Sequence, residues 1–255
     1  MIDMDGVIYA GEELIDGADQ FVKKLLKKKI DFTFLSNNSS RSRAEAVEKL
    51  AKLGIEVTEA HIYTSAMATA TFLKDQDPGC SAFVLGEGGL LKSLDHAGIK
   101  LVDKNPDYVI LGEGHEFSLT KVHEAVDMIL SGARFIATNK DPTPRKPGWN
   151  NLGIAATAAM IEEGSGCKPF VIGKPSPVMM RSAAAYMGLQ PAQTTVVGDT
   201  METDIKGGVY MGFKTILVLS GIADKQMLNA YGFKPSLVVE TANHIRFPLK
   251  WWEDK

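Results

Sequence analysis

The stretch TTVVGDTMETD, residues 194–204, begins as a short apolar run, passes through a glycine and continues at once into carboxylates. A run of this length next to turn residues is typical of a buried strand in a parallel sheet. Similar runs recur at residues 30–36, 81–86, 107–112, 133–139, 169–173 and 213–220. Helical patterns lie between them, most clearly at residues 18–29, 43–54, 118–130 and 177–188. This alternation predicts an α/β fold with helices on both faces of parallel sheets.

Composition limits the classes of protein that the chain can belong to. The 255 residues are enough for one large domain or two modest ones, and a net charge of -3 provides no basic surface for nucleic acid or anionic lipid. No apolar run approaches the roughly 20 residues of a membrane span. Cys80 and Cys167 lie in no metal-binding motif, and acidic residues stand where a signal peptide would be basic. We therefore expect a soluble cytoplasmic protein with reduced thiols and no nucleic-acid or membrane partner.

The middle of the chain contains a weak repeat, LGEG at residues 85–88 and again at 111–114. Neither copy has the third glycine of a dinucleotide-binding fingerprint, so we interpret both as turns of two strand–helix units in one subdomain. Segments rich in turn residues lie near positions 80 and 170. We therefore predict a core domain formed by residues 1–79 and 171–255, with a second domain inserted at 80–170.

Acidic residues follow two of the expected strands. At a strand end, positions i and i+2 share a face, so Asp3 and Asp5 can converge, and two close carboxylates favour a shared proton or a bound cation. Asp199 and Asp204 follow another expected strand and can complete such a site. Oxygen ligands of this kind suit Mg²⁺.

The same residues suit phosphoryl transfer. An aspartate is ionised at neutral pH and can attack phosphorus without a base, while a second carboxyl group manages the proton. The transferring group needs a hydroxyl, backbone N–H groups and a lysine, and Ser36, Asn37 and Lys174 are suitable types. Each piece alone also fits a turn or a helix cap. However, an acidic pair, a hydroxyl and amide, a lysine and a second acidic motif, each after an apolar strand and in that order, are not expected from turns alone.

Four motifs, DMDG (3–6), LSNN (35–38), GKP (173–175) and GDTMETD (198–204), together resemble those of the haloacid dehalogenase superfamily. The segments at 63–73, 133–141, 170–177 and 215–222 resemble its NagD-like phosphatase subgroup. The resemblance implies a Rossmann-like, doubly wound core with a smaller inserted α/β cap of type C2. Members usually have a longer apolar run before the first aspartate than Met1 and Ile2. We therefore expect either an unusually short first strand or a few missing residues.

Roles follow from the resemblance. It implies that Asp3 is the nucleophile and forms an aspartyl-phosphate, and that Asp5 is the general acid and base. Ser36 and Asn37 would hold the phosphoryl group, and Lys174 would neutralise its charge. The Mg²⁺ ligands would be the Asp3 carboxylate, the Asp5 backbone carbonyl and Asp199, with Asp204 as a ligand or as its support. The residues implied in substrate binding are Asn38, Asn139, Asp141 and Arg145.

The implied activity is a Mg²⁺-dependent phosphatase for small phosphorylated metabolites, with nucleoside monophosphates ahead of sugar phosphates and aryl phosphates. One alternative is a phospho-accepting signalling domain, which also uses an acidic cluster and a lysine. Another is a binding protein that keeps the fold and has impaired catalysis. Trp251 and Trp252 either dock on the core or join a homodimer, and the sequence does not decide between these.

Overall fold

The computed structural model describes residues 1–114, 118–142 and 152–249. The chain divides into two compact units: a first unit of residues 1–35, 46–62 and 183–255, and a second unit of residues 36–45 and 63–182. This division assigns residues 36–45, 63–79 and 171–182 to the second unit, whereas the sequence predicts them in the core domain. The inserted domain at 80–170 stays a prediction.

The first unit is built on parallel strand pairing. Strands β10 (Thr195–Gly198), β11 (Lys214–Val218) and β12 (Leu237–Val239) form a parallel sheet in that order. Ile2 adds a single rung beside β10, because it forms parallel bridges to both Phe34 and Val197. Asp3 follows this rung directly.

Helix α1 (Ala18–Lys28) illustrates how the first unit closes its core. Phe21, Val22 and Leu25 repeat at helical spacing and are buried, whereas the lysines of this helix are exposed. The core around them includes Ile8, Phe34, Leu50 and Ile216. The remaining elements of this unit are a hairpin of β1 (Tyr9–Ala10) and β2 (Glu13–Leu14), the π-helical turn η3 (Met201–Ile205), α8 (Lys206–Tyr210) and 3₁₀ turns at Glu59–His61, Pro191–Gln193, Met227–Ala230 and Ala242–His244.

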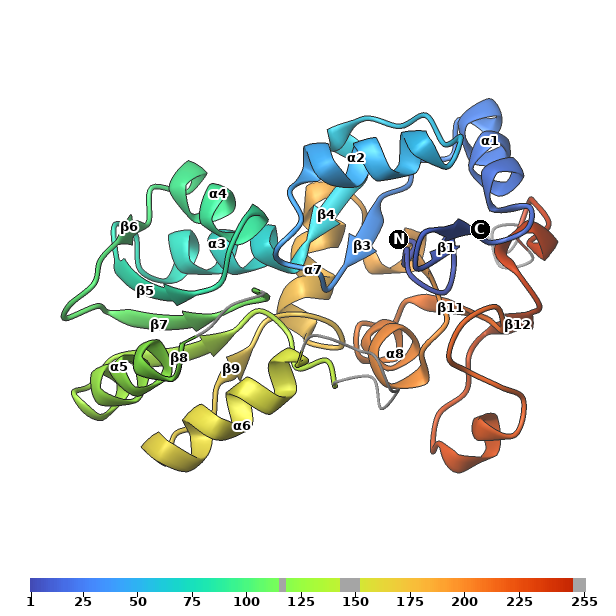
Figure 1. Ribbon diagram of the computed structural model, residues 1–255. Coiled ribbons are helices and arrows are strands. Elements are labelled where there is room, and N and C mark those ends of the chain that lie inside the picture. The colour runs from blue at the N-terminus through green and yellow to red at the C-terminus, as the bar shows by residue number, and fades with distance from the viewer. Residues whose placement is uncertain (115–117, 143–151, 250–255) are drawn as a thin grey trace. The chain divides into compact units, whose positions relative to one another are not determined.

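The second unit has a parallel sheet of its own. Its strands in spatial order are β6 (Lys100–Leu101), β5 (Ser81–Leu85), β7 (Tyr108–Leu111), β8 (Arg134–Ala137) and β9 (Phe170–Val171). Helices α5 (Leu119–Leu130) and α6 (Ile154–Ser165) pack on one face, and α3 (Ser65–Gln76) and α4 (Gly89–His96) lie on the other (Figure 1). Hydroxyl caps begin two of these helices: Thr64 accepts from the Met67 N–H, and Ser118 accepts from the Lys121 N–H.

Four elements contribute residues to both units: β3 (Phe34–Ser36), α2 (Arg43–Lys52), β4 (Ile62–Thr64) and α7 (Pro177–Tyr186). Helices or helical turns separate most of the parallel strands along the chain in both units, which confirms the predicted α/β class. In the part of the chain that the structure describes, no helix has the length and apolar character needed to cross a bilayer.

The two LGEG turns follow neighbouring strands, β5 and β7. The Gly112 N–H donates to the Leu85 carbonyl at 2.7 Å, and the Glu87 N–H donates to the Glu113 carbonyl at 3.2 Å. Gly86 and Gly112 are packed so closely that a Cβ on Gly86 would lie 3.4 Å from the Gly112 Cα. The repeat therefore marks two equivalent turns at the carboxyl edge of this sheet, as predicted.

Candidate functional site

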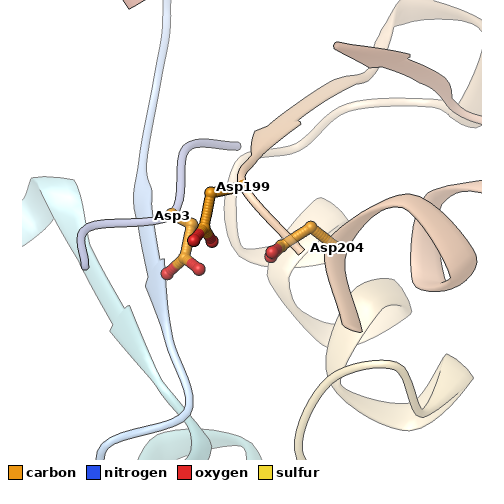
Figure 2. A group of neighbouring side chains, drawn as sticks. All are labelled: Asp3, Asp199 and Asp204. Atoms are coloured by element: carbon orange, nitrogen blue, oxygen red, sulfur yellow. The ribbon is translucent and has the colours of Figure 1, made fainter. Parts of the chain in front are cut away.

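Three carboxylates of the first unit meet where its strands end. Asp3, Asp199 and Asp204 each present an oxygen, and these oxygens all lie within 4.8 Å of one another. Figure 2 shows the Asp204 side chain directed toward the other two. Asp199 and Asp204 are almost fully buried, with 3% and 1% of their surface exposed. Like charges this close and this buried repel one another unless a cation or a proton intervenes.

The Asp199 carboxylate is oriented from both sides. Its Oδ2 accepts from the Ile222 N–H at 2.8 Å, and its Oδ1 accepts from the Thr200 hydroxyl at 3.0 Å. Gly6 and Gly221 flank it so tightly that a Cβ would lie 2.3 Å and 2.0 Å from Oδ2, respectively. The two glycines are therefore needed for the carboxylate to occupy this position.

Asp204 lies on η3, a wide π-helical turn that starts two residues after Asp199. Its Oδ2 accepts from the Thr200 N–H at 3.4 Å and from the Thr203 hydroxyl at 3.2 Å. A Cβ on Gly198 would lie 2.2 Å from the Asp204 Cβ, so only glycine fits at the end of β10. π-Helical turns occur frequently at functional sites, and this one brings Asp204 back over the strand end.

Asp3 and Asp5 differ in their surroundings. The Asp3 N–H donates to the Val197 carbonyl at 2.9 Å, which fixes Asp3 beside β10, and Asp3 Oδ1 accepts from the Met4 N–H at 2.8 Å. Asp5 is exposed, and the three-carboxylate group does not include its side chain. The next residue, Gly6, accepts the Ser220 hydroxyl on its carbonyl at 2.7 Å. This bond ties the turn after Asp3 to the loop that holds Asp199.

The chemistry of these donors fits a hard divalent cation. All three side chains offer carboxylate oxygens, and Mg²⁺ is held in proteins through one or two carboxylates together with waters and phosphate oxygens. We therefore identify Asp3, Asp199 and Asp204 as residues that could hold Mg²⁺.

The second unit holds a separate group built on Asn37 and Lys174. The Asn37 side chain pairs with the Lys174 backbone in both directions: Oδ1 accepts from the Lys174 N–H at 2.7 Å, and Nδ2 donates to the Lys174 carbonyl at 3.2 Å. Nδ2 also donates to both Asp141 carboxylate oxygens, at 2.9 and 3.1 Å. Gly173 makes this pairing possible, because a Cβ there would lie 2.7 Å from Asn37 Oδ1.

The other predicted residues of the second unit lie around this pair. Asn139 is fully buried, and its Nδ2 donates to the Asn37 carbonyl at 2.8 Å while its Oδ1 accepts from the Asp141 N–H at 2.9 Å. The Ser36 hydroxyl accepts from the Asn38 N–H at 3.1 Å, and Asn38 Oδ1 accepts from the Arg41 N–H at 2.7 Å.

Those amide groups are thus used to hold the loop after β3 together. The prediction that Asn38, Asn139 and Asp141 contact substrate stays a prediction. Arg145 lies outside the described residues.

Sequence reasoning missed Glu113, which it interpreted as part of a turn. Its carboxylate Oε2 accepts from the Ser39 N–H at 2.9 Å, and its Oε1 accepts from Asn139 Nδ2 at 3.4 Å. Burial raises the pKa of this carboxyl above its ordinary value, although the Ser39 and Ser40 N–H groups act in the opposite direction. The only sequence feature that could have drawn attention to Glu113 is its place in the second LGEG turn. Glu87 has the same place in the first turn, so this feature does not distinguish the two glutamates.

Comparison with known proteins defines the class of protein. Residues 1–100 match the family described as haloacid dehalogenase-like hydrolase, and residues 171–245 match a HAD-hydrolase-like family. Dihydroxyacetone phosphatase of Corynebacterium glutamicum is 40% identical over 254 residues, which cover 100% of this chain and 91% of that protein. The resemblance stated from the motifs is therefore confirmed.

Two solved structures indicate which subgroup of this superfamily the chain resembles. The structure of NagD from Escherichia coli K-12, 38% identical in sequence, superimposes with a TM-score of 0.91 over 96% of each chain. A glycerol phosphate phosphatase from Mycobacterium tuberculosis in complex with magnesium is 28% identical, with a TM-score of 0.88 over 95% of this chain and 74% of that one. The chain belongs to the haloacid dehalogenase superfamily, within its NagD-like phosphatase subgroup. It is a phosphoric monoester hydrolase with the core fold of that family.

Proposed function

We propose that this phosphatase hydrolyses small phosphomonoesters through an aspartyl-phosphate on Asp3, with Mg²⁺ as cofactor. The observation that carries the proposal is the cluster of Asp3, Asp199 and Asp204 at the strand ends of the first unit. When bound, Mg²⁺ would neutralise negative charge on the carboxylates and on the phosphoryl oxygens. The residues that would hold it are Asp3 and Asp199, with Asp204 as a ligand or as their support and Asp5 contributing its backbone carbonyl.

The proposed reaction has two steps. In the first, an Asp3 carboxylate oxygen attacks phosphorus, the P–O bond to the leaving group breaks, and Asp5 donates a proton to the leaving oxygen. In the second, Asp5 takes a proton from water, the water oxygen attacks phosphorus, and the bond between Asp3 and phosphorus breaks. Phosphate leaves, and both aspartates return to their starting states.

Residues of the second unit are assigned to the phosphoryl group on the strength of family membership. Ser36 would donate its hydroxyl and Lys174 its ammonium to the phosphoryl oxygens. Asn37 would act through its backbone N–H, because its side-chain amide is engaged by Lys174 and Asp141. The bonds of Asn139 to the Asn37 carbonyl favour a role in holding this loop.

The substrate class is proposed from the relatives. One is named as a dihydroxyacetone phosphatase and another as a ribonucleotide monophosphatase, so we expect small phosphorylated metabolites, with nucleoside monophosphates first and sugar and aryl phosphates also accepted. Asn38, Asn139 and Asp141 are the described residues proposed to contact such substrates. The cytoplasmic location and a homodimer stay predictions.

The test is phosphate release from dihydroxyacetone phosphate, AMP, glucose 6-phosphate and p-nitrophenyl phosphate, with Mg²⁺ and with EDTA. We expect turnover with Mg²⁺ only, and a loss of at least about 10⁴-fold in Asp3→Asn. Asp16→Asn, which changes an exposed carboxylate, is the matched control and should keep full activity. Turnover in EDTA or in Asp3→Asn would contradict the mechanism. A stable phosphorylated Asp3 without steady turnover would support the signalling alternative.

A further inference from the structure

Glu113 and Glu87 occupy the same position in the two LGEG turns, but the structure treats them differently. Ser39 and Glu113 form a closed ring of two hydrogen bonds: the Ser39 N–H donates to Glu113 Oε2 at 2.9 Å, and the Glu113 N–H donates to the Ser39 hydroxyl at 2.9 Å. The Ser40 N–H also points to Oε2, at 3.5 Å. All these residues belong to the second unit, so this geometry is internal to it.

The ring extends to neighbouring strand ends of the same sheet. Ser39 is fully buried, and its hydroxyl also accepts from the Thr138 hydroxyl at 3.1 Å. Gly112 allows the close approach, because a Cβ there would lie 3.1 Å from the Ser39 hydroxyl oxygen. The Glu113 carboxylate and the Ser39 hydroxyl therefore both help to fasten the loop after β3 to the ends of β7 and β8.

The same carboxylate reaches the residues assigned to phosphoryl binding. Asn139 Nδ2 lies between Glu113 Oε1, at 3.4 Å, and the Asn37 carbonyl, at 2.8 Å. Asn37 in turn holds the Lys174 backbone. Glu113 is thus two hydrogen bonds away from the Asn37 carbonyl.

We propose that Glu113 is a positioning residue for phosphoryl transfer, which holds the Ser36–Ser40 loop and the Asn37 peptide in the geometry that receives the phosphoryl group. This inference rests on the proposed function of Ser36, Asn37 and Lys174. A carboxylate suits the task because three N–H donors, from Ser39, Ser40 and Asn139, converge on its two oxygens. A glutamine of the same shape would turn an N–H toward one of those donors.

Keeping a carboxylate here has a cost for the fold. Burial and the nearby Asp141 charge both raise the pKa of Glu113, so its ionised form is disfavoured in the folded state. An acid with a raised pKa destabilises the fold progressively as pH rises from the unfolded pKa through the folded one. Glu113→Gln cannot ionise, so it escapes this loss. If Glu113 served only to stabilise the fold, its replacement by glutamine would be expected to lower stability.

The experiment compares Glu113→Gln with Glu87→Gln, the equivalent glutamate of the other turn. Enzymes lose activity steeply when a reacting group is misplaced by about 1 Å, so we expect kcat of Glu113→Gln to fall by about 10- to 100-fold. The fall should be the same for AMP, dihydroxyacetone phosphate and p-nitrophenyl phosphate, because the phosphoryl group is common to all three. The inhibition constant of inorganic phosphate should rise in the same variant. Its unfolding midpoint at pH 8 should stay close to that of the wild type, because the loss of a buried charge offsets the mismatched N–H of the glutamine.

The controls separate the possible failures. Glu87→Gln should match the wild type, and Glu113→Asp, which keeps the charge, should recover part of the lost kcat. Parallel losses of activity and stability in Glu113→Gln, a loss confined to one substrate, or equal losses in both glutamine variants would each overturn the inference. A wild-type enzyme that releases no phosphate would instead contradict the proposed function.

Discussion

The carboxylate cluster of the first unit and the hydrogen-bonded loop of the second are organised on opposite principles. Asp3, Asp199 and Asp204 gather charges of one sign, which repel in the absence of a cation. Asn37 and Glu113 instead match each donor to an acceptor, so their loop is held without any added group. The carboxylate cluster is expected to reduce stability in return for metal binding, whereas the hydrogen bonds of the Asn37 side chain are expected to increase it. Substitutions in the carboxylate cluster should therefore mainly change Mg²⁺ affinity, whereas substitution of Asn37 should mainly lower the free energy of unfolding.

The largest effect on stability is expected for Asn37→Ala. The change leaves the Lys174 N–H, the Lys174 carbonyl and the Asp141 carboxylate without the Asn37 partner, and unmade buried hydrogen bonds cost about 1 to 3 kcal/mol each. We expect the free energy of unfolding to fall by about 3 kcal/mol, together with activity. Urea denaturation measures this, with Asn229→Ala, at an exposed position, as control. Unchanged stability would show that the loop is not held as described.

Asp199→Asn should weaken Mg²⁺ binding by roughly 100-fold, or about 2.7 kcal/mol, because a neutral amide replaces a charged ligand. The amide oxygen can still accept from the Ile222 N–H, so the fold should persist. Isothermal titration with Mg²⁺ measures the affinity, and Asp16→Asn serves as the control. Equal affinities in the two variants would exclude Asp199 as a ligand.

Gly221→Ala tests whether a close approach, rather than a charge, positions Asp199. The new Cβ would lie 2.0 Å from Asp199 Oδ2, so the carboxylate must rotate away. We expect about tenfold weaker Mg²⁺ binding, or about 1.4 kcal/mol. Gly232→Ala is the matched control, because a Cβ at Gly232 has no atom within 4 Å. An effect of the same size in both variants would assign the loss to backbone entropy.

The smallest expected effect is a gain in stability rather than a loss. Asp204→Asn removes one of three mutually repelling charges, so the metal-free protein should become more stable by about 1 kcal/mol. Thermal unfolding in EDTA should show a higher midpoint than for the wild type, and added Mg²⁺ should reduce or reverse the difference. A lower midpoint in EDTA would mean that the carboxylate group stabilises the fold by itself.

The sequence predicts most of the parallel strands, because these lie in compact apolar runs. Residues 194–198 and 107–112 contain β10 and β7, and the helical pattern at 118–130 contains α5. Strand β12, Leu237–Val239, was missed because its apolar run is only three residues long and is only partly buried. Short elements without strong periodicity depend on their neighbours for their conformation.

The site was predictable to the extent that its residues lie in local motifs. Asp3, Asp199 and Asp204 come from two such motifs, and strand-end placement explains why they meet. Glu113 and the use of the Asn37 side chain were not predictable, because their partners lie 74 and 137 residues away. Such pairings depend on which strand ends become neighbours in the sheet. The sequences of the turns do not indicate which neighbours these will be.

The single rung formed by Ile2 has a consequence for biosynthesis. The Leu35 N–H donates to the Ile2 carbonyl, while the Asp3 N–H donates to the Val197 carbonyl and the Val197 N–H donates to the Met1 carbonyl. The backbone of Asp3 can thus pair with β10 only after residue 197 has been translated. Contacts over such separations form late, because a long loop must close before they are made. On the ribosome, the backbone of Asp3 is therefore held against β10 only late in synthesis.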